Sequence, residues 1–132
     1  MLKYMLDTNI CIFTIKNKPK QVKDRFNLNA SRLCISTVTL MELIYGAEKS
    51  LAPERNLTII EGFVAHLEIL NYDAPAAAHS GHIRAELAKQ GSPIGPFDLM
   101  IAGHARSRGL AIVTNNTREF ERVDGLRLED WC

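Results

Sequence analysis

The chain has 132 residues, of which 46% are hydrophobic and 23% are charged, and its formal net charge is +1. This length suits one domain with a substantial core, and the composition excludes a disordered or fibrous protein. Because the molecule as a whole is not basic, a nucleic-acid site would have to come from local clustering of positive charge.

Three features bear on the location of the protein. Its 3 cysteines lack CxxC spacing, which suits a reducing compartment. No hydrophobic run is long enough to cross a bilayer, and Met1 leads directly into the first expected strand, leaving no room for a signal peptide. We therefore expect a cytoplasmic protein.

The chain begins with a short apolar segment, Tyr4–Leu6, that predicts a buried strand ending at Asp7. The following elements alternate between helices and strands. In chain order they are a helix at 10–15, a helix from Pro19, a strand at 33–36, a helix entered through Ser36, a helix from Pro53, a strand at 67–72, a helix at 74–90, a helix from Pro96 to near Arg108, a strand at 110–114 and a short strand at 126–128.

This alternation predicts an α/β fold, a three-layer α/β/α sandwich with a central mostly parallel sheet and helices on both faces. The segment 110–114 is apolar until Thr114, as a central parallel strand should be. Neither a repeat nor a linker divides the chain, so residues 1–132 are expected to form a single domain.

Acidic side chains follow the expected strands. Asp7 comes directly after the first strand, Glu42 lies in the helix after the second, and Glu119 follows the strand at 110–114 together with Asn116. Asp98 lies in the first turn of the helix from Pro96. Because the carboxyl ends of parallel strands meet at one edge of the sheet, where ligands collect, we expect at least the first three positions to lie near that edge.

Each acidic residue also has a purely local explanation. Asp7 can be a helix N-cap, and the dipole of a helix favours Asp98 in a first turn. Glu42 and Glu119 each stand three residues after a possible cap, which is capping-box spacing. Together, however, neighbouring carboxylates repel one another unless a cation joins them. A set of oxygen ligands without Cys or His predicts Mg²⁺ or Mn²⁺, ions that clamp phosphates and activate water for hydrolysis.

Two other kinds of site compete with this one. His79 and His82 are three residues apart on one expected helix and could share a metal, but no third ligand is near them in sequence. Phosphatases and receiver domains also place Asp after a first strand. The former need a second Asp where Asn9 stands, and the latter need a Lys that residues 110–120 lack.

A basic segment at 16–32 contains a single acid, Asp24. Such a run is often only a solvated face, but it can also hold the backbone of a nucleic acid, because phosphate contacts position a substrate without reading its sequence. The candidate RNA-binding residues are Lys16, Lys18, Lys20 and Lys23.

Four segments in this order resemble the PIN-domain ribonucleases, and among these the VapC-type toxins of bacterial toxin–antitoxin pairs. They are LDTN at 6–9, STVTLMEL at 36–43, PFDLMIA at 96–102, and VTNN at 113–116 followed by Glu119 and Phe120. The resemblance covers the whole chain and implies the PIN-like α/β/α fold.

The resemblance also implies a metal-dependent active site. The acidic residues of the family map onto Asp7, Glu42 and Asp98, with a fourth position near Thr114 and Asn116. Many PIN domains have Asp where this chain has Asn116. Glu119, one helical turn away, is a candidate substitute, and both the occupant of this fourth position and the number of metal ions, one or two, stay open. Asp7 and Asp98 would bind the metal, and the residues expected to orient carboxylates or contact phosphate are Thr8, Asn9, Ser36, Thr114 and Asn116.

Family toxins cut structured RNA, often tRNA, are silenced by a co-expressed antitoxin and commonly form homodimers. The resemblance therefore implies a Mg²⁺-dependent endoribonuclease toxin, with Mn²⁺ as a substitute ion, whose partners are an antitoxin, RNA and a second copy of itself. The alternative is a catalytically weak PIN fold that only binds RNA or a partner, but such a protein would be expected to lack Asp7 or Asp98, and both are present.

Overall fold

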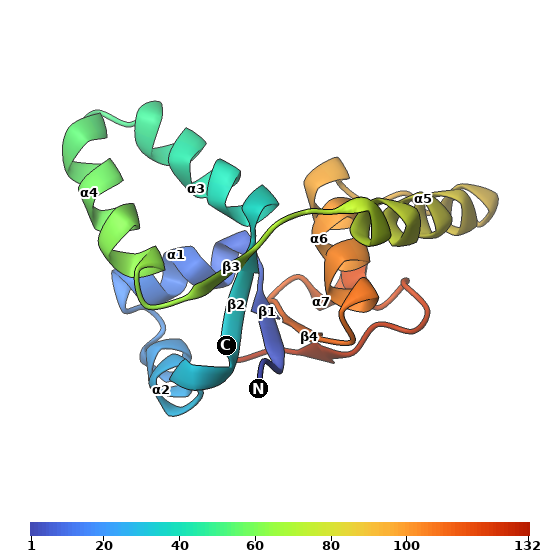
Figure 1. Cartoon of the computed structure of the whole chain (residues 1–132), viewed down its shortest axis with the longest axis horizontal. Coiled ribbons are helices and arrows are strands. Elements are labelled where there is room, and N and C mark those ends of the chain that lie inside the picture. Colours follow the sequence, from blue (N-terminus) through green and yellow to red (C-terminus); the bar gives the residue numbers. More distant parts are fainter.

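The computed structural model describes residues 1–132 and alternates between strands and helices (Figure 1). The strands are β1 (Tyr4–Leu6), β2 (Leu33–Ser36), β3 (Glu68–Leu70), β4 (Ala111–Val113) and β5 (Leu128–Glu129). The helices are α1 (Thr8–Lys16), α2 (Lys20–Leu28), α3 (Thr37–Glu48), α4 (Pro53–Val64), α5 (Ala74–Lys89), α6 (Pro96–Ser107) and α7 (Thr117–Phe120), with a 3-10 turn, η1 (Ala30–Arg32), before β2.

The strands form one sheet in the order β3-β2-β1-β4-β5, and every neighbouring pair is parallel. The chain builds outward from β1 to β3, then crosses back to place β4 and β5 on the other side of β1. The winding direction therefore changes between β1 and β4. The crevice outside the carboxyl ends of two such strands is where open α/β sheets bind ligands, and Asp7 follows β1 at this point.

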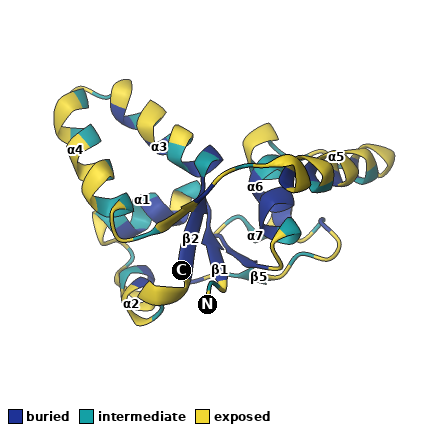
Figure 2. Cartoon of the chain, viewed as in Figure 1, coloured by how far each residue is buried: buried dark blue, intermediate teal, exposed yellow.

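Alternate strand residues enter two separate cores, which explains why the central strands β1, β2 and β4 contain almost no polar residue. Met5 and Ile112 join a core with Ile101 of α6, whereas Tyr4 and Leu6 join a core on the opposite face of the sheet. That second core includes residues of α1 and α2. Figure 2 shows the buried central strands β1 and β2 between helices with exposed outer faces. The predicted three-layer sandwich is confirmed.

Helices α3 and α4 pack together as an arm that projects from the body (Figure 1). No residue of α4 is buried, and the arm leaves large apolar side chains exposed, among them Tyr45 and Leu51. None of the helices is both long enough and apolar enough to cross a membrane.

Several boundaries differ from the prediction: the helix expected at 10–15 spans Thr8–Lys16, and the strands expected at 67–72 and 110–114 shorten to Glu68–Leu70 and Ala111–Val113. Pro19 has extended backbone angles and precedes α2, which begins at Lys20, because a proline is equally suited to the position just before a helix. The last strand covers Leu128–Glu129 and not 126–128, because its register is set by β4, where Ile112 pairs with Leu128 and Val113 with Glu129.

Candidate active site

Asp7 lies at the junction of β1 and α1 and is only 3% exposed. The backbone N–H of Ile10 donates a hydrogen bond to its Oδ1 at 2.9 Å, so Asp7 does cap the helix. Burial, and to a lesser extent the charges of Glu42 and Asp130, raise its pKa to about 6, although hydrogen bonds from Thr114 and Ile10 oppose the rise. A cap alone would lower this pKa. Capping therefore explains the local geometry of Asp7 but not its electrostatic environment.

Glu42 reaches the site from α3 and is held by a residue of α1. The hydroxyl of Thr8 donates a hydrogen bond to Oε1 of Glu42 at 2.6 Å. The cap of α3 is Ser36, whose Oγ accepts the N–H of Val38, while the buried hydroxyl of Thr39 has no hydrogen-bond partner. The Thr39–Glu42 spacing therefore does not form a capping box, and Glu42 is directed toward Thr8, the residue after Asp7.

Asp98 lies half-buried in the first turn of α6. Its pKa is raised to about 7, first by burial, then by a hydrogen bond with Glu119 and by the charge of that residue. The charges of Asp7 and Glu42 raise it further. Helix α6 runs antiparallel to the strands, which places its N-terminus at the carboxyl edge of the sheet. The other three predicted catalytic carboxylates therefore all act on Asp98 at that edge.

Asn116 holds the fourth carboxylate in place. Its Nδ2 donates a hydrogen bond to Oε2 of Glu119 at 2.7 Å, and its backbone N–H donates to the hydroxyl of Thr114 at 2.8 Å. The side chain of Asn116 makes no capping bond to α7. Because the N–H that Glu119 would accept in a capping box is bonded to Thr114, the capping explanation does not apply here.

The other residues expected to support the carboxylates differ in their burial and in the groups they contact. Thr114 is fully buried and its hydroxyl serves both Asp7 and Asn116. Asn9 is exposed on α1. Ser36 is also fully buried, and its hydroxyl contacts Nδ1 of His104 at 2.8 Å and none of the four carboxylates.

Asp130 is a fifth acidic residue near the site, and sequence reasoning missed it. Leu6 pairs with Val113 and Val113 with Glu129, so Asp7, Thr114 and Asp130 are the next residues of three adjacent strands. The charge of Asp130 contributes to the raised pKa of Asp7. A strand of two residues leaves almost no pattern in the sequence, so only an acid close to the C-terminus could have pointed to this position.

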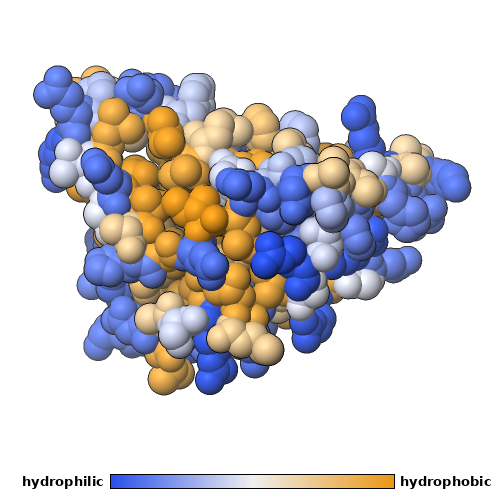
Figure 3. Space-filling model, viewed as in Figure 1, coloured by the Kyte–Doolittle hydropathy of each residue, from blue (hydrophilic) through white to orange (hydrophobic).

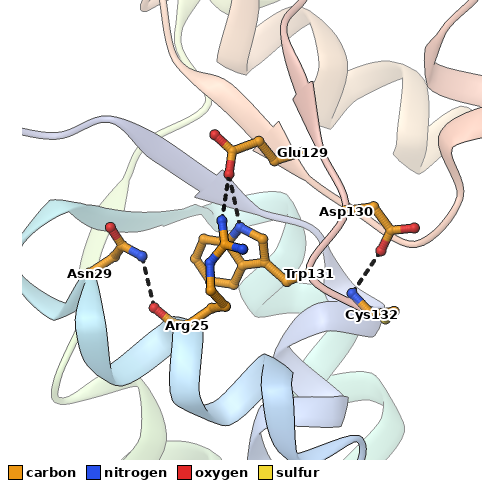
Figure 4. A network of polar contacts seen from close by, with 6 residues as sticks. All are labelled: Arg25, Asn29, Glu129, Asp130, Trp131 and Cys132. Carbon is orange, nitrogen blue, oxygen red and sulfur yellow. Dashed lines mark hydrogen bonds and ion pairs between the residues drawn. The ribbon is translucent and has the colours of Figure 1, made fainter.

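The C-terminal tail is fastened beside the site by three residues, Arg25, Glu129 and Trp131, which we name the C-terminal clasp. Arg25 forms an ion pair with Oε1 of Glu129 at 3.1 Å, and the indole N–H of Trp131 donates to the same oxygen at 3.1 Å (Figure 4). The guanidinium also lies 5.4 Å from the centre of the Trp131 ring.

Asp7, Glu42, Asp98 and Glu119, which we name the acidic cluster, offer only oxygen donors. None of them forms an ion pair with Lys or Arg. No three His, Cys, Asp or Glu side chains are already arranged to hold a metal ion, so a cation would draw the carboxylates inward or complete its shell with water, as Mg²⁺ commonly does. The donor chemistry and the missing positive charge fit a hard divalent cation.

His79 and His82 on α5 both contact the guanidinium of Arg106. Nε of Arg106 donates to Nδ1 of His79 at 2.9 Å, and its NH2 group lies 3.1 Å from Nδ1 of His82. Since a guanidinium occupies the face that a metal would need, these histidines do not form the alternative metal site.

The four candidate RNA-binding lysines lie on α1, on α2 and in the turn between them. Lys16 ends α1 and lines the same groove as Glu42. Lys18 and Lys20 are exposed, and the ammonium of Lys23 lies 5.6 Å from the centre of the Phe26 ring on α2. None of the four forms an ion pair, so all four ammonium groups are available to an anionic ligand.

The groove shared by Lys16 and Glu42 lies between α1, α3 and α4 and has a volume of about 480 Å³. We name it the apolar groove, because six of its lining residues are hydrophobic, among them Ile12, Ile59 and Ile60. Figure 3 shows hydrophobic residues gathered on this side of the molecule, between the α3–α4 arm and the body.

Comparison with known proteins agrees with this geometry. A family model described as PIN domain matches residues 4–126. The chain is 71% identical to the tRNA(fMet)-specific endonuclease VapC of Salmonella typhimurium over 100% of both chains. It is 76% identical to the protein of the same name from Shigella flexneri over 99% of each. Its fold matches the crystal structure of DNA bound VapBC from Salmonella typhimurium with a TM-score of 0.96 and 71% identity, covering 100% of both chains.

The chain therefore belongs to the PIN-domain family, and within it to the VapC group. This confirms the resemblance found in the four sequence segments.

Proposed function

We propose that the chain is an endoribonuclease toxin that hydrolyses RNA with a divalent cation, Mg²⁺ or Mn²⁺, held at the acidic cluster. The observation that carries the proposal is that the cluster brings carboxylates of three other segments within range of Asp98 and gives none of the four an ion-pair partner. Four acids that repel one another at a sheet edge, with no basic partner, form a site that becomes favourable when a cation enters.

The side chains of the cluster have separate roles in this proposal. Asp7 and Asp98 are the ligands, because burial has already removed part of their hydration. A bound divalent cation would polarise a phosphodiester and lower the pKa of water beside it. Glu42 and Glu119 add the negative charge that holds the cation, and neighbouring side chains keep them in place: Thr8 bonds Glu42, and Asn116 bonds Glu119.

The proposed substrate is a structured RNA, and the name of the relatives from Salmonella typhimurium and Shigella flexneri makes tRNA(fMet) the first candidate. Lys16, Lys18, Lys20 and Lys23 would contact its backbone. Each Lys→Gln substitution at these positions should remove one phosphate interaction, weaken binding to all RNAs and reduce the salt slope of the affinity by about one. An unchanged salt slope would indicate that the basic segment at 16–32 is only a solvated face.

The proposed protein partner is an antitoxin, since several solved relatives of similar fold are VapBC complexes. The apolar groove is the surface we assign to it, because exposed apolar surface of this kind marks protein contacts. Ile59→Asp should prevent neutralisation by the antitoxin and leave RNA cleavage intact. We also expect the isolated chain to form a homodimer, which light scattering of the purified protein would measure.

A cleavage assay tests the proposed function. Purified protein is incubated with initiator tRNA and with an elongator tRNA in Mg²⁺, in Mn²⁺ and in excess chelator, with Asp98→Asn as the control for contaminating nucleases. We expect discrete cleavage that needs the added ion and is absent in the control. Cleavage that persists in chelator would contradict the metal mechanism. RNA binding without cleavage under any ion would favour the binding-module alternative.

A further inference from the structure

His104 is a buried polar residue that the acidic cluster does not explain. It lies on α6, is 0% exposed, and burial lowers its pKa, so the imidazole is neutral at pH 7. Its Nδ1 is hydrogen-bonded to the hydroxyl of Ser36 at 2.8 Å, but its Nε2 has no hydrogen-bond partner in the protein. A buried nitrogen without a partner costs free energy that an apolar side chain of similar size would not. The position therefore suggests a purpose beyond packing.

The hydrogen bond joins the two helices that carry Asp98 and Glu42. Ser36 is the N-cap of α3 and accepts the N–H of Val38 with the same hydroxyl oxygen. Ser36 precedes Glu42 by six residues, and His104 follows Asp98 by six, which corresponds to roughly 9 Å along each helix. Helices α3 and α6 also contact each other directly. A small rotation at the contact would change the separation of the two carboxylates.

The other side of His104 is packed so that the imidazole cannot easily move. The ring of Tyr72 meets it edge to face, with ring centres 5.6 Å apart, and the hydroxyl of Tyr72 donates to Oγ of Ser80 on α5 at 2.7 Å. The neighbouring Gly103 lies so close to Ser80 that an added Cβ would overlap its side chain. The backbone of α6 is thus pressed against α5 on one side and bonded to α3 on the other.

We propose that His104 is a positioning residue, whose hydrogen bond to Ser36 fixes α6 against the start of α3 and thereby sets the spacing of Asp98 and Glu42 for cation binding. This inference rests on the proposed function of the acidic cluster. It gives Ser36 a different task from the one expected from the sequence, since Ser36 acts through the junction of two helices and touches no carboxylate.

The experiment measures Mn²⁺ affinity by electron paramagnetic resonance, which follows the free ion and needs no RNA cleavage. The variants are His104→Leu, which keeps the volume but removes the bond, His104→Asn, which keeps an amide near the position of Nδ1, Ser36→Ala, and the double variant His104→Leu/Ser36→Ala. Val22→Ala, in the core on the opposite face of the sheet, controls for lost stability. All titrations are made well below each melting temperature.

We expect His104→Leu and Ser36→Ala each to weaken Mn²⁺ binding by about 10-fold, the low end for residues that support metal ligands. The double variant should lose no more than either single one, and His104→Asn should stay within about 3-fold of the unaltered chain, because the contact is one unit. Val22→Ala should bind Mn²⁺ normally even if it melts at a lower temperature.

Normal affinity in His104→Leu, or an equal loss in Val22→Ala, would overturn the positioning role while leaving the proposed function intact. If His104→Leu does not fold, Ser36→Ala decides in the same way, because it removes the same hydrogen bond from the other side. Absence of Mn²⁺ binding in the unaltered chain would instead overturn the proposed function, and this inference with it.

Discussion

The acidic cluster and the C-terminal clasp lie close together but treat their carboxylates in opposite ways. In the clasp, Glu129 is partly exposed and receives both the guanidinium of Arg25 and the indole N–H of Trp131. In the cluster, Asp7 is buried and Asp98 half-buried, and the charges nearest to them are other acids.

The difference shows that the clasp stabilises the fold, whereas the acidic cluster does not. A paired and exposed carboxylate gives a weak surface contact, which here holds the last strand in place. Unpaired carboxylates at one sheet edge raise the free energy of the metal-free protein, and folding alone does not explain their presence. The cluster is thus the region of the molecule where stability and activity should respond in opposite directions to substitution.

The largest effect should come from removing a ligand charge. Asp98→Asn and Asp7→Asn keep the shape of the side chain, and Asn at position 7 can still cap α1. Substitution of residues that only support metal ligands reduces metal affinity or activity by about 10- to 100-fold. Loss of a ligand itself should therefore reduce RNA cleavage by more than about 100-fold. Initial rates at saturating Mg²⁺, measured on variants whose circular dichroism matches the unaltered chain, test this. Retained cleavage in a correctly folded Asp7→Asn variant would show that Asp7 is only a helix cap.

The second effect is on stability and follows from the raised pKa of Asp7, about 6 against an ordinary 3.8. The folded chain keeps this proton longer than the unfolded chain, so the stabilisation is full below pH 3.8 and is lost as pH rises through about 6. At about 1.4 kcal/mol per pKa unit, Asp7 should destabilise the metal-free chain by about 3 kcal/mol at pH 8.

Urea unfolding in the presence of chelator measures this contribution as the difference in unfolding free energy between Asp7→Asn and the unaltered chain. Asp7→Asn should be more stable than the unaltered chain at pH 8, and the two should converge near pH 4. Asp98, whose pKa is about 7, should act in the same direction over a range that extends to higher pH. If Asp7→Asn is the less stable protein at pH 8, folding does not raise the pKa of Asp7, and neither its burial nor the neighbouring acids disfavour the charged carboxylate.

A smaller effect is expected at the fourth acidic position, where substitutions can distinguish the roles of Asn116 and Glu119. Glu119→Gln should reduce cleavage by about 10-fold and raise the Mg²⁺ concentration needed, because it removes a charge that acts on Asp98. Asn116→Asp should be tolerated or should tighten Mg²⁺ binding, since it adds a carboxylate. Metal titrations run beside thermal melts would show whether Glu119→Gln loses stability in place of metal affinity, which is what a capping role requires.

The smallest effect belongs to the clasp. Arg25→Gln should lower the free energy of unfolding by about 1 kcal/mol or less, because the ion pair is exposed. Cleavage should not change, since Arg25 touches none of the catalytic carboxylates. Chemical denaturation and the RNA assay on the same preparation measure both quantities, and a large loss of activity would mean that the clasp positions the site through Asp130.

The sequence was sufficient to predict the fold and to place acidic residues after the strands, because these signals are local; the acidic cluster as a catalytic site stays a prediction. Apolar segments such as Tyr4–Leu6 indicate strands covered on both faces, and an acid directly after a parallel strand lies at the carboxyl edge whatever the details of packing. Contacts between distant elements leave no such trace. The pairing of Ser36 with His104 and the register that brings Asp130 beside Asp7 depend on how helices and strands meet in three dimensions.

In the proposed function, the acidic cluster holds a divalent cation in place of protons. Calorimetric titration with Mn²⁺ in buffers of different ionisation enthalpy tests it directly, because the heat reports how many protons leave when the ion binds. With Asp7 at a pKa of about 6 and Asp98 at about 7, binding should release close to one proton or more per ion at pH 6 and almost none at pH 8.5. Binding that releases no protons at pH 6, or the same release in Asp7→Asn and Asp98→Asn, would contradict the account.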